Sequence, residues 1–209
     1  LAGIAVAAFG VILAHALGVD MVFWRASEQP DVPFVTDSFV TQTTIVSFCL
    51  AVGLAVKQTL AESMRGTWLW LLHRPATRGQ LIALKVATGG AIYLAGAGLP
   101  IVFYACWAAW PRTHASPFYW SMTESAWQAW GIVALMYLGT FLSALRPGRW
   151  MGTRLLPVAG TFTLAATIYD LFQWGGSWFA ITSMWALLVL LGAALVASIQ
   201  HVGGVRDFS

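Results

Sequence analysis

Six long stretches that are almost free of charged residues limit most strongly how this chain can fold. They run approximately over residues 1–18, 39–56, 86–110, 125–145, 155–173 and 178–200. Each is close to the length of about 20 residues that a helix needs to cross about 30 Å of hydrocarbon. Because 59% of the 209 residues are hydrophobic, a water-soluble domain of this size could not hide its apolar side chains. We therefore expect an all-α, polytopic transmembrane helical bundle of about six spans, forming a single domain over residues 1–209.

The start of the chain allows two interpretations. The first stretch begins at Leu1, without a methionine or a flanking charge, so we expect the amino terminus to be truncated. A signal peptide is the competing interpretation of residues 1–18. It is disfavoured because no basic segment precedes the stretch and no small-residue cleavage site separates it from the next residues of the chain.

The distribution of basic residues predicts the orientation of the bundle. If residues 19–38 face outside, nine of the 11 basic residues fall in segments on the inner side, and only Arg25 and Arg112 fall on the outer side. Multi-pass proteins retain basic residues on their cytoplasmic face. We therefore expect residues 57–85 and the C-terminus to lie in the cytoplasm, and the protein to reside in the plasma membrane, the inner membrane of a bacterium.

The sequence argues against several kinds of chemistry. No Gly-Lys dipeptide occurs, which excludes a phosphate-binding G-x-x-x-x-G-K-[ST] loop from this chain. No group of His, Cys, Asp and Glu residues has metal-ligand spacing, and no G-x-S-x-G nucleophile elbow is present. The basic residues are divided among short loops and form no face for nucleic acid. We therefore expect no metal, cofactor, nucleic acid or enzymatic activity in this chain.

Three polar residues within the predicted spans are candidate sites: His15, Thr43 and Asp170. Ionisable groups inside a membrane are functional candidates by default. A lone histidine, however, is more often a neutral, hydrogen-bonded part of a helix bundle, and Asp170 lies close enough to the outer end of its span to reach water. Thr43 belongs to a polar run, residues 41–44, that either lines a cavity or marks where the helix meets the interface.

The third predicted span combines small residues with residues that weaken a helix. Ala87, Ala91 and Ala95 recur at four-residue spacing, which predicts close approach to another helix. The same span holds residues that favour bending or local unwinding: Gly89, Gly90, Gly96, Gly98 and Pro100. Ordinary helix packing is the simpler interpretation of both patterns.

Residues 57–85 form the longest inner loop and have the pattern of an ordered elbow. Apolar residues of its first part share one helical face, at i, i+4, i+8, i+11 and i+12: Leu60, Met64, Trp68, Leu71 and Leu72. Pro75 ends this surface helix, because proline disfavours helical geometry in the residue before it. Thr77 and Gln80 have the T-x-x-Q spacing of a capping box, which predicts that a new helix begins there. Such an elbow either docks a partner or only connects two spans.

The residues of this elbow resemble the cytoplasmic signature of ABC-2 type transporter permeases. In that family an E-x-x-x-G-T element ends the second span, and an L-L-x-x-P-[hydrophobic]-[ST]-R element leads into the third. The matching residues are Glu62, Arg65, Gly66, Thr67, Leu71, Leu72, Pro75, Thr77, Arg78 and, further on, Lys85. The resemblance implies that Glu62 to Arg78 form the coupling helix that contacts a cytoplasmic ATPase subunit.

The resemblance further implies the membrane-spanning permease subunit of an ABC transporter, moving an unidentified substrate with energy from a separate ATP-binding subunit. Its expected partners are that subunit, a second permease copy or homologue, and membrane lipid. One alternative is an integral membrane structural or assembly protein without transport activity. Another is a membrane-embedded enzyme, which would require convergent polar side chains at a common depth, and the sequence offers no such set.

Overall fold

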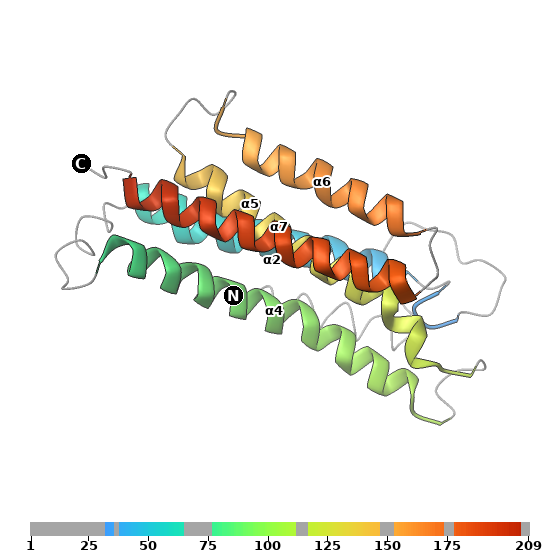
Figure 1. The fold of residues 1–209 in the computed structure, drawn as a ribbon. Helices are drawn as coiled ribbons and strands as arrows, with labels where there is room; N and C mark the ends of the chain where they lie inside the picture. The colour runs from blue at the N-terminus through green and yellow to red at the C-terminus, as the bar shows by residue number, and fades with distance from the viewer. Residues whose placement is uncertain are drawn as a thin grey trace. The chain divides into compact units, whose positions relative to one another are not determined.

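The computed structural model describes residues 32–35, 38–64, 77–111, 117–146, 153–173 and 178–205. These residues form five long α-helices and one short 3-10 helix (Figure 1). The helices are α2 (Phe39–Met64), α4 (Arg78–Ala108), η1 (Trp120–Thr123), α5 (Glu124–Leu145), α6 (Leu156–Gln173) and α7 (Trp178–Val205). No strand occurs in the described ranges, so the predicted all-α class is confirmed for this part of the chain.

Four helical stretches of the described residues are long and apolar enough to cross a membrane. They are Phe39–Leu60 in α2, Arg78–Ala108 in α4, Trp120–Leu145 in η1 and α5, and Ile181–Gly204 in α7. The chain is thus a multi-pass helical membrane protein. A helix satisfies all its backbone hydrogen bonds internally, which lipid demands of any segment that crosses it.

The described residues give four candidate spans where six were predicted, and the two missing spans have different reasons. The first predicted span, residues 1–18, lies outside the described residues. The fifth, residues 155–173, does form a helix, α6, but this helix is not among the four candidates. Within α6 only residues 156–170 are described together with their side chains, a stretch shorter than the 18 residues that a candidate span needs.

The helices α2 and α4 extend beyond the predicted boundaries. Helix α2 continues past residue 56 to Met64, and α4 begins at Arg78 instead of near residue 86. The predicted capping box opens α4, since the Thr77 N–H donates to Gln80 Oε1 at 3.1 Å and the Gln80 N–H to Thr77 Oγ1 at 3.4 Å. This prediction is confirmed. Helix α4 also stays helical through Pro100, so the local unwinding considered for this span is absent.

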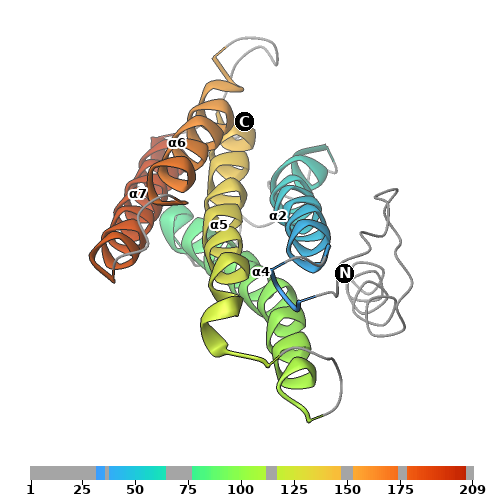
Figure 2. The same ribbon diagram turned by 90° about the vertical axis from the view of Figure 1, so that its right-hand side faces the viewer.

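Contacts between residues divide the chain into two units, and parts of α2, α4 and α5 belong to each. The first unit comprises the described residues of Leu1–Leu50 and Tyr93–Trp130. The second comprises the described residues of Ala51–Ile92 and Gly131–Ser209. The second unit therefore contains all of α6 and α7, and these two helices lie side by side (Figure 2).

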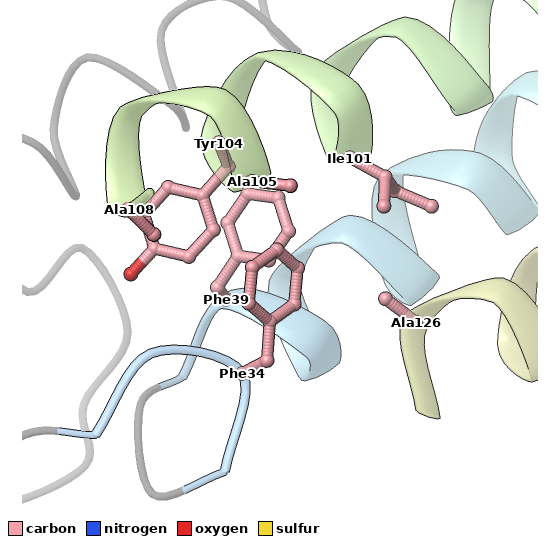
Figure 3. Close-up of a cluster of buried hydrophobic side chains, with 7 residues drawn as sticks. All are labelled: Phe34, Phe39, Ile101, Tyr104, Ala105, Ala108 and Ala126. Carbon is pink, nitrogen blue, oxygen red and sulfur yellow. The ribbon is translucent and has the colours of Figure 1, made fainter. Parts of the chain in front are cut away.

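Aromatic side chains form the core of the first unit (Figure 3). The rings of Phe39 in α2 and Tyr104 in α4 are stacked, with centroids 4.0 Å apart. Phe34 packs against both, at 5.2 Å from Phe39 and 4.9 Å from Tyr104. Phe34 has a φ of 64°, a conformation that costs a residue with a Cβ about 1–3 kcal/mol. The contacts of its buried ring offset that cost.

The predicted stripe of small residues on α4 does not pack within the described part of the chain, because Ala87, Ala91 and Ala95 are all exposed. Close approach occurs at glycines instead. A Cβ on Gly131 would lie 2.6 Å from the Trp185 ring, and a Cβ on Gly139 would lie 2.6 Å from Thr161 Oγ1. Glycine at these positions lets α5 lie close to α7 and α6, as is usual where helices pack in lipid.

Candidate functional site

Most of the predicted coupling residues lie outside the described part of the chain: Arg65, Gly66, Thr67, Leu71, Leu72 and Pro75. Glu62 is in the last turn of α2, and Thr77 and Arg78 are exposed at the start of α4. The structure therefore gives the two helix ends that flank residues 65–76. The predicted coupling element continues from the end of α2 and leads into the start of α4.

The three predicted intramembrane sites have separate outcomes. His15 lies outside the described residues. Thr43 is buried in α2 next to Gln42, whose Nε2 donates to Ser38 Oγ at 2.8 Å, so this polar run belongs partly to the interior of the first unit. Asp170 is exposed on α6. Among the described residues no group of three or more His, Cys, Asp or Glu side chains could hold a metal ion.

Basic residues gather at one end of the second unit. Figure 1 shows that α2 and α5 end, and α4 and α6 begin, at this end. The basic residues on or beside these helix ends are Lys57, Arg78, Lys85, Arg146 and Arg154. Asp170 lies near the opposite end of α6. The helix ends that flank residues 65–76 are therefore part of a cationic end of the bundle.

Arg154 joins two of these helix ends. Its Nη2 donates to the carbonyl of Ala144 at 2.9 Å and its Nε to the carbonyl of Ser143 at 3.3 Å. Ser143 Oγ in turn accepts from the N–H of Val158 in the first turn of α6 at 3.0 Å. A cation at the last carbonyls of a helix is favourable, because those carbonyls lack partners within the helix and carry partial negative charge. The end of α5 and the start of α6 are thus held together.

A buried polar contact connects α2, α4 and α5 in the second unit. The Tyr137 hydroxyl of α5 donates to Gln58 Oε1 of α2 at 2.8 Å. The same hydroxyl lies 3.3 Å from the Val86 carbonyl and 3.5 Å from the Lys85 carbonyl of α4. We call these residues, together with Gly89, the Tyr137 junction. Its residues on α2 and α4 lie about two to three turns inside the helix ends that flank residues 65–76.

Gly89 makes this junction possible. A Cβ at Gly89 would overlap the Tyr137 hydroxyl and would lie 2.5 Å from Gln58 Oε1 and 2.6 Å from Gln58 Nε2. Only a residue without a side chain lets both polar groups lie directly on the backbone of α4. Gly90, the next residue, has no atom within 4 Å of such a Cβ. The requirement for glycine is thus specific to one face of α4.

Sequence reasoning did not identify Gln58 or Tyr137. Gln58 lies just beyond the predicted end of the second span and was assigned to the loop, and Tyr137 lies within an otherwise apolar stretch. The available signal was Gly89, whose position in a glycine-rich span indicated a possible bend. A search for glycines that face polar residues on neighbouring helices would have required knowing which helices are neighbours.

The first unit contains a second buried tyrosine that bonds between helices. Tyr93 of α4 donates from its hydroxyl to the Trp130 carbonyl of α5 at 2.8 Å, and Trp130 Nε1 donates to the Leu94 carbonyl of α4 at 3.3 Å. This pair links only α4 and α5. The Tyr137 junction differs because it also includes α2, the helix that leads into residues 65–76.

Comparisons with models of known protein families, with characterised proteins and with solved structures gave no match. The likeness to ABC-2 type permeases therefore rests on the residues of the elbow and on the helices beside it.

Proposed function

We propose that this chain is the membrane-spanning permease subunit of an ABC-2 type ABC transporter. The observation that carries the proposal is the start of α4 at the Thr77–Gln80 capping box. In the family signature the P-x-[ST]-R element leads into the third span, and Pro75, Thr77 and Arg78 occupy that position between α2 and α4. A coupling element can pass the movement of an ATPase into the membrane only if it is continuous with a transmembrane helix.

The proposed permease has six spans, with residues 1–18 as the first and α6 as the fifth. The threonines of α6 disfavour lipid less than the composition of this helix suggests, because their hydroxyls are hydrogen-bonded to carbonyls of the same helix. Thr161, Thr163 and Thr167 each donate to the carbonyl four residues earlier, at 2.7, 3.0 and 2.8 Å. A hydroxyl satisfied in this way enters lipid at much lower cost than a free one.

The orientation follows from the cationic end of the second unit. Basic residues are retained on the cytoplasmic side of the bacterial inner membrane, so the helix ends that carry Lys57, Arg78 and Lys85 face the cytoplasm. In the proposed permease the Glu62–Arg78 element and the C-terminus lie on the side where ATP is available. No phosphate-binding loop occurs in the sequence, so a separate subunit supplies ATP hydrolysis.

The mechanism combines two such bundles with two ATPase subunits. Closure of the ATPases on ATP pushes the Glu62–Arg78 elements and shifts each bundle between inward-open and outward-open packings. Arg65, Arg78 and Glu62 make charge-assisted contacts with the ATPase. The surrounding lipid stabilises the apolar outer faces of the helices. No buried charge among the described residues selects a class of substrate.

Co-purification tests this proposal. The double variant Glu62→Ala with Arg78→Ala should lower recovery of a co-expressed ATPase about tenfold or more, since each lost charge-assisted contact is worth at least 1 kcal/mol. Arg146→Ala is the matched control, because this arginine belongs to the same cationic end but lies outside the signature. Equal recovery of the ATPase with all variants, or recovery of none with the unaltered chain, contradicts the proposal and favours a structural or assembly role.

Orientation has its own test. A single cysteine at Arg78, with Cys49 and Cys106 replaced by serine, should react with a membrane-impermeant maleimide only after the cells are opened. Cys49 and Cys106 are the two cysteines of the sequence, so their replacement leaves position 78 as the single thiol. Labelling of intact cells at position 78 would contradict a cytoplasmic elbow.

A further inference from the structure

The Tyr137 hydroxyl carries one proton and faces acceptors on two different helices. Gln58 Oε1 is the closest of them at 2.8 Å, and the Val86 and Lys85 carbonyls lie at 3.3 and 3.5 Å. A hydroxyl donates one hydrogen bond at a time. The bond to α2 is therefore the one that the geometry favours, and the hydroxyl meets α4 through its close contact with Gly89.

The contact is crowded and largely buried. Tyr137 is 2% exposed and Gly89 is buried, and both polar atoms of the Gln58 amide lie over Gly89. Separation of α2 from α5 would take the Tyr137 donor away from the Gln58 oxygen, and a buried polar group that loses its partner destabilises the packing. The three helices can move together without breaking this bond, but they cannot move independently.

The position of the junction gives it a role beyond packing. Gln58 belongs to the final part of α2, and Lys85 to Gly89 belong to the first part of α4. These are the two helix parts that enter and leave residues 65–76. A displacement of that segment therefore reaches the Tyr137 junction through both of its flanking helices.

We infer that Tyr137 is a positioning residue that fastens the ends of α2 and α4 flanking residues 65–76 to α5, so that the three helices move as one body. The fastening itself is a property of the described helices. Its use in passing the push of an ATPase to α5 rests on the proposed function. The two parts are tested separately.

The fastening is tested by distances between spin labels on α2 and α4. The labels replace Val56 and Leu84, both exposed, in the full chain with Cys49→Ser and Cys106→Ser, reconstituted in lipid nanodiscs. The unaltered junction should give one narrow distance peak. Tyr137→Phe keeps the ring and removes the hydroxyl, and it should abolish that single narrow peak. Gln58→Leu should do the same, and the two together should add nothing further.

Tyr93→Phe is the matched control. It removes a hydroxyl of the same kind, which bonds to Trp130 at the same 2.8 Å, but in the first unit. It should leave the peak between positions 56 and 84 as narrow as before. A narrow peak in Tyr137→Phe and in Gln58→Leu, or equal broadening in Tyr93→Phe, overturns the fastening.

The transmission is tested in the complex with a co-purified ATPase, with labels at Leu84 on α4 and Arg146 after α5. Addition of Mg-ATP should leave this distance unchanged when the junction is intact, because α4 and α5 move together. It should shift the distance in Tyr137→Phe. A shift of equal size in both overturns the transmission. Absence of any co-purifying ATPase overturns the proposed function instead, while the result between positions 56 and 84 still decides the fastening.

Discussion

In the first unit three aromatic rings fill the space where α2 meets α4, whereas in the second unit one tyrosine hydroxyl links the same two helices to α5. Phe34, Phe39 and Tyr104 contact each other through ring faces and edges, and none of these contacts depends on a single atom. At the Tyr137 junction the contact depends on one proton and on the missing side chain of Gly89.

This difference predicts how substitutions should affect the stability of each unit. Dispersion contacts between rings are many and individually weak, so their loss scales with the volume removed. A buried hydrogen bond between helices is a single contact, so it is either made or lost. The aromatic contacts of the first unit should therefore weaken gradually as ring volume is removed. The Tyr137 contact of the second unit should respond to the loss of a single atom.

The largest effect is expected from Phe39→Ala, which tests the aromatic side of the comparison. Phe39 is fully buried, and removal of a buried phenyl ring costs about 3 kcal/mol or more of unfolding free energy. Phe103→Ala on α4 is the control, because Phe103 is 63% exposed. Unfolding in mixed micelles with increasing denaturing detergent measures both. Similar losses for the two variants would mean that the aromatic cluster does not hold the first unit.

Gly89→Ala should have the next largest effect and tests the junction by crowding it. The added methyl group overlaps the Tyr137 hydroxyl and approaches Gln58, and such overpacking typically costs about 1–3 kcal/mol. The neighbouring Gly90→Ala meets nothing within 4 Å and should be neutral or should stabilise α4 by up to about 1 kcal/mol. The same unfolding measurement applies. If both glycines tolerate alanine equally, Gln58 and Tyr137 do not meet over Gly89.

The sequence predicted the helices of this protein better than their boundaries. Long apolar runs predicted α2, α4, α5 and α7, because a helix that crosses lipid needs about 20 apolar residues and can be recognised from composition alone. The end of α2 was placed too early because Lys57 and Gln58 were assigned to a loop, although α2 continues to Met64. The start of α4 was predictable from Thr77 and Gln80, since a capping box is a local interaction.

The candidate junction was beyond sequence reasoning because it depends on which helix faces overlap. The alanine repeat at 87, 91 and 95 suggested the packing face of α4, but these residues are exposed and Gly89 makes the contact instead. Nothing in the residues near Tyr137 marks it as different from Tyr93. Their partners, Gln58 and the Trp130 carbonyl, come from elements that only the fold brings together.

Tyr137→Phe and Tyr93→Phe sharpen the comparison by removing one hydroxyl from each unit. Each should lower the unfolding free energy by about 0.6 kcal/mol, and by no more than about 1.7 kcal/mol, as is found for hydrogen bonds between membrane helices. Their effects should be additive, because the two bonds share no atom and lie in different units. A strongly non-additive double variant would mean that the two hydrogen bonds depend on each other.

The smallest loss of unfolding free energy is expected from substitution of Arg154. These variants test whether charge also stabilises the second unit. Arg154→Gln removes the charged guanidinium that donates to the Ser143 and Ala144 carbonyls and should cost about 0.3–1 kcal/mol, the usual worth of a cation at a helix C-terminus. Arg154→Lys separates the two causes, because lysine keeps the charge but cannot place two donors in a fixed fork. Full stability with lysine would show that α5 needs only positive charge at its end. Equal losses with lysine and glutamine would show that geometry decides, as it does at Tyr137, and that the second unit is held by directed hydrogen bonds at both places.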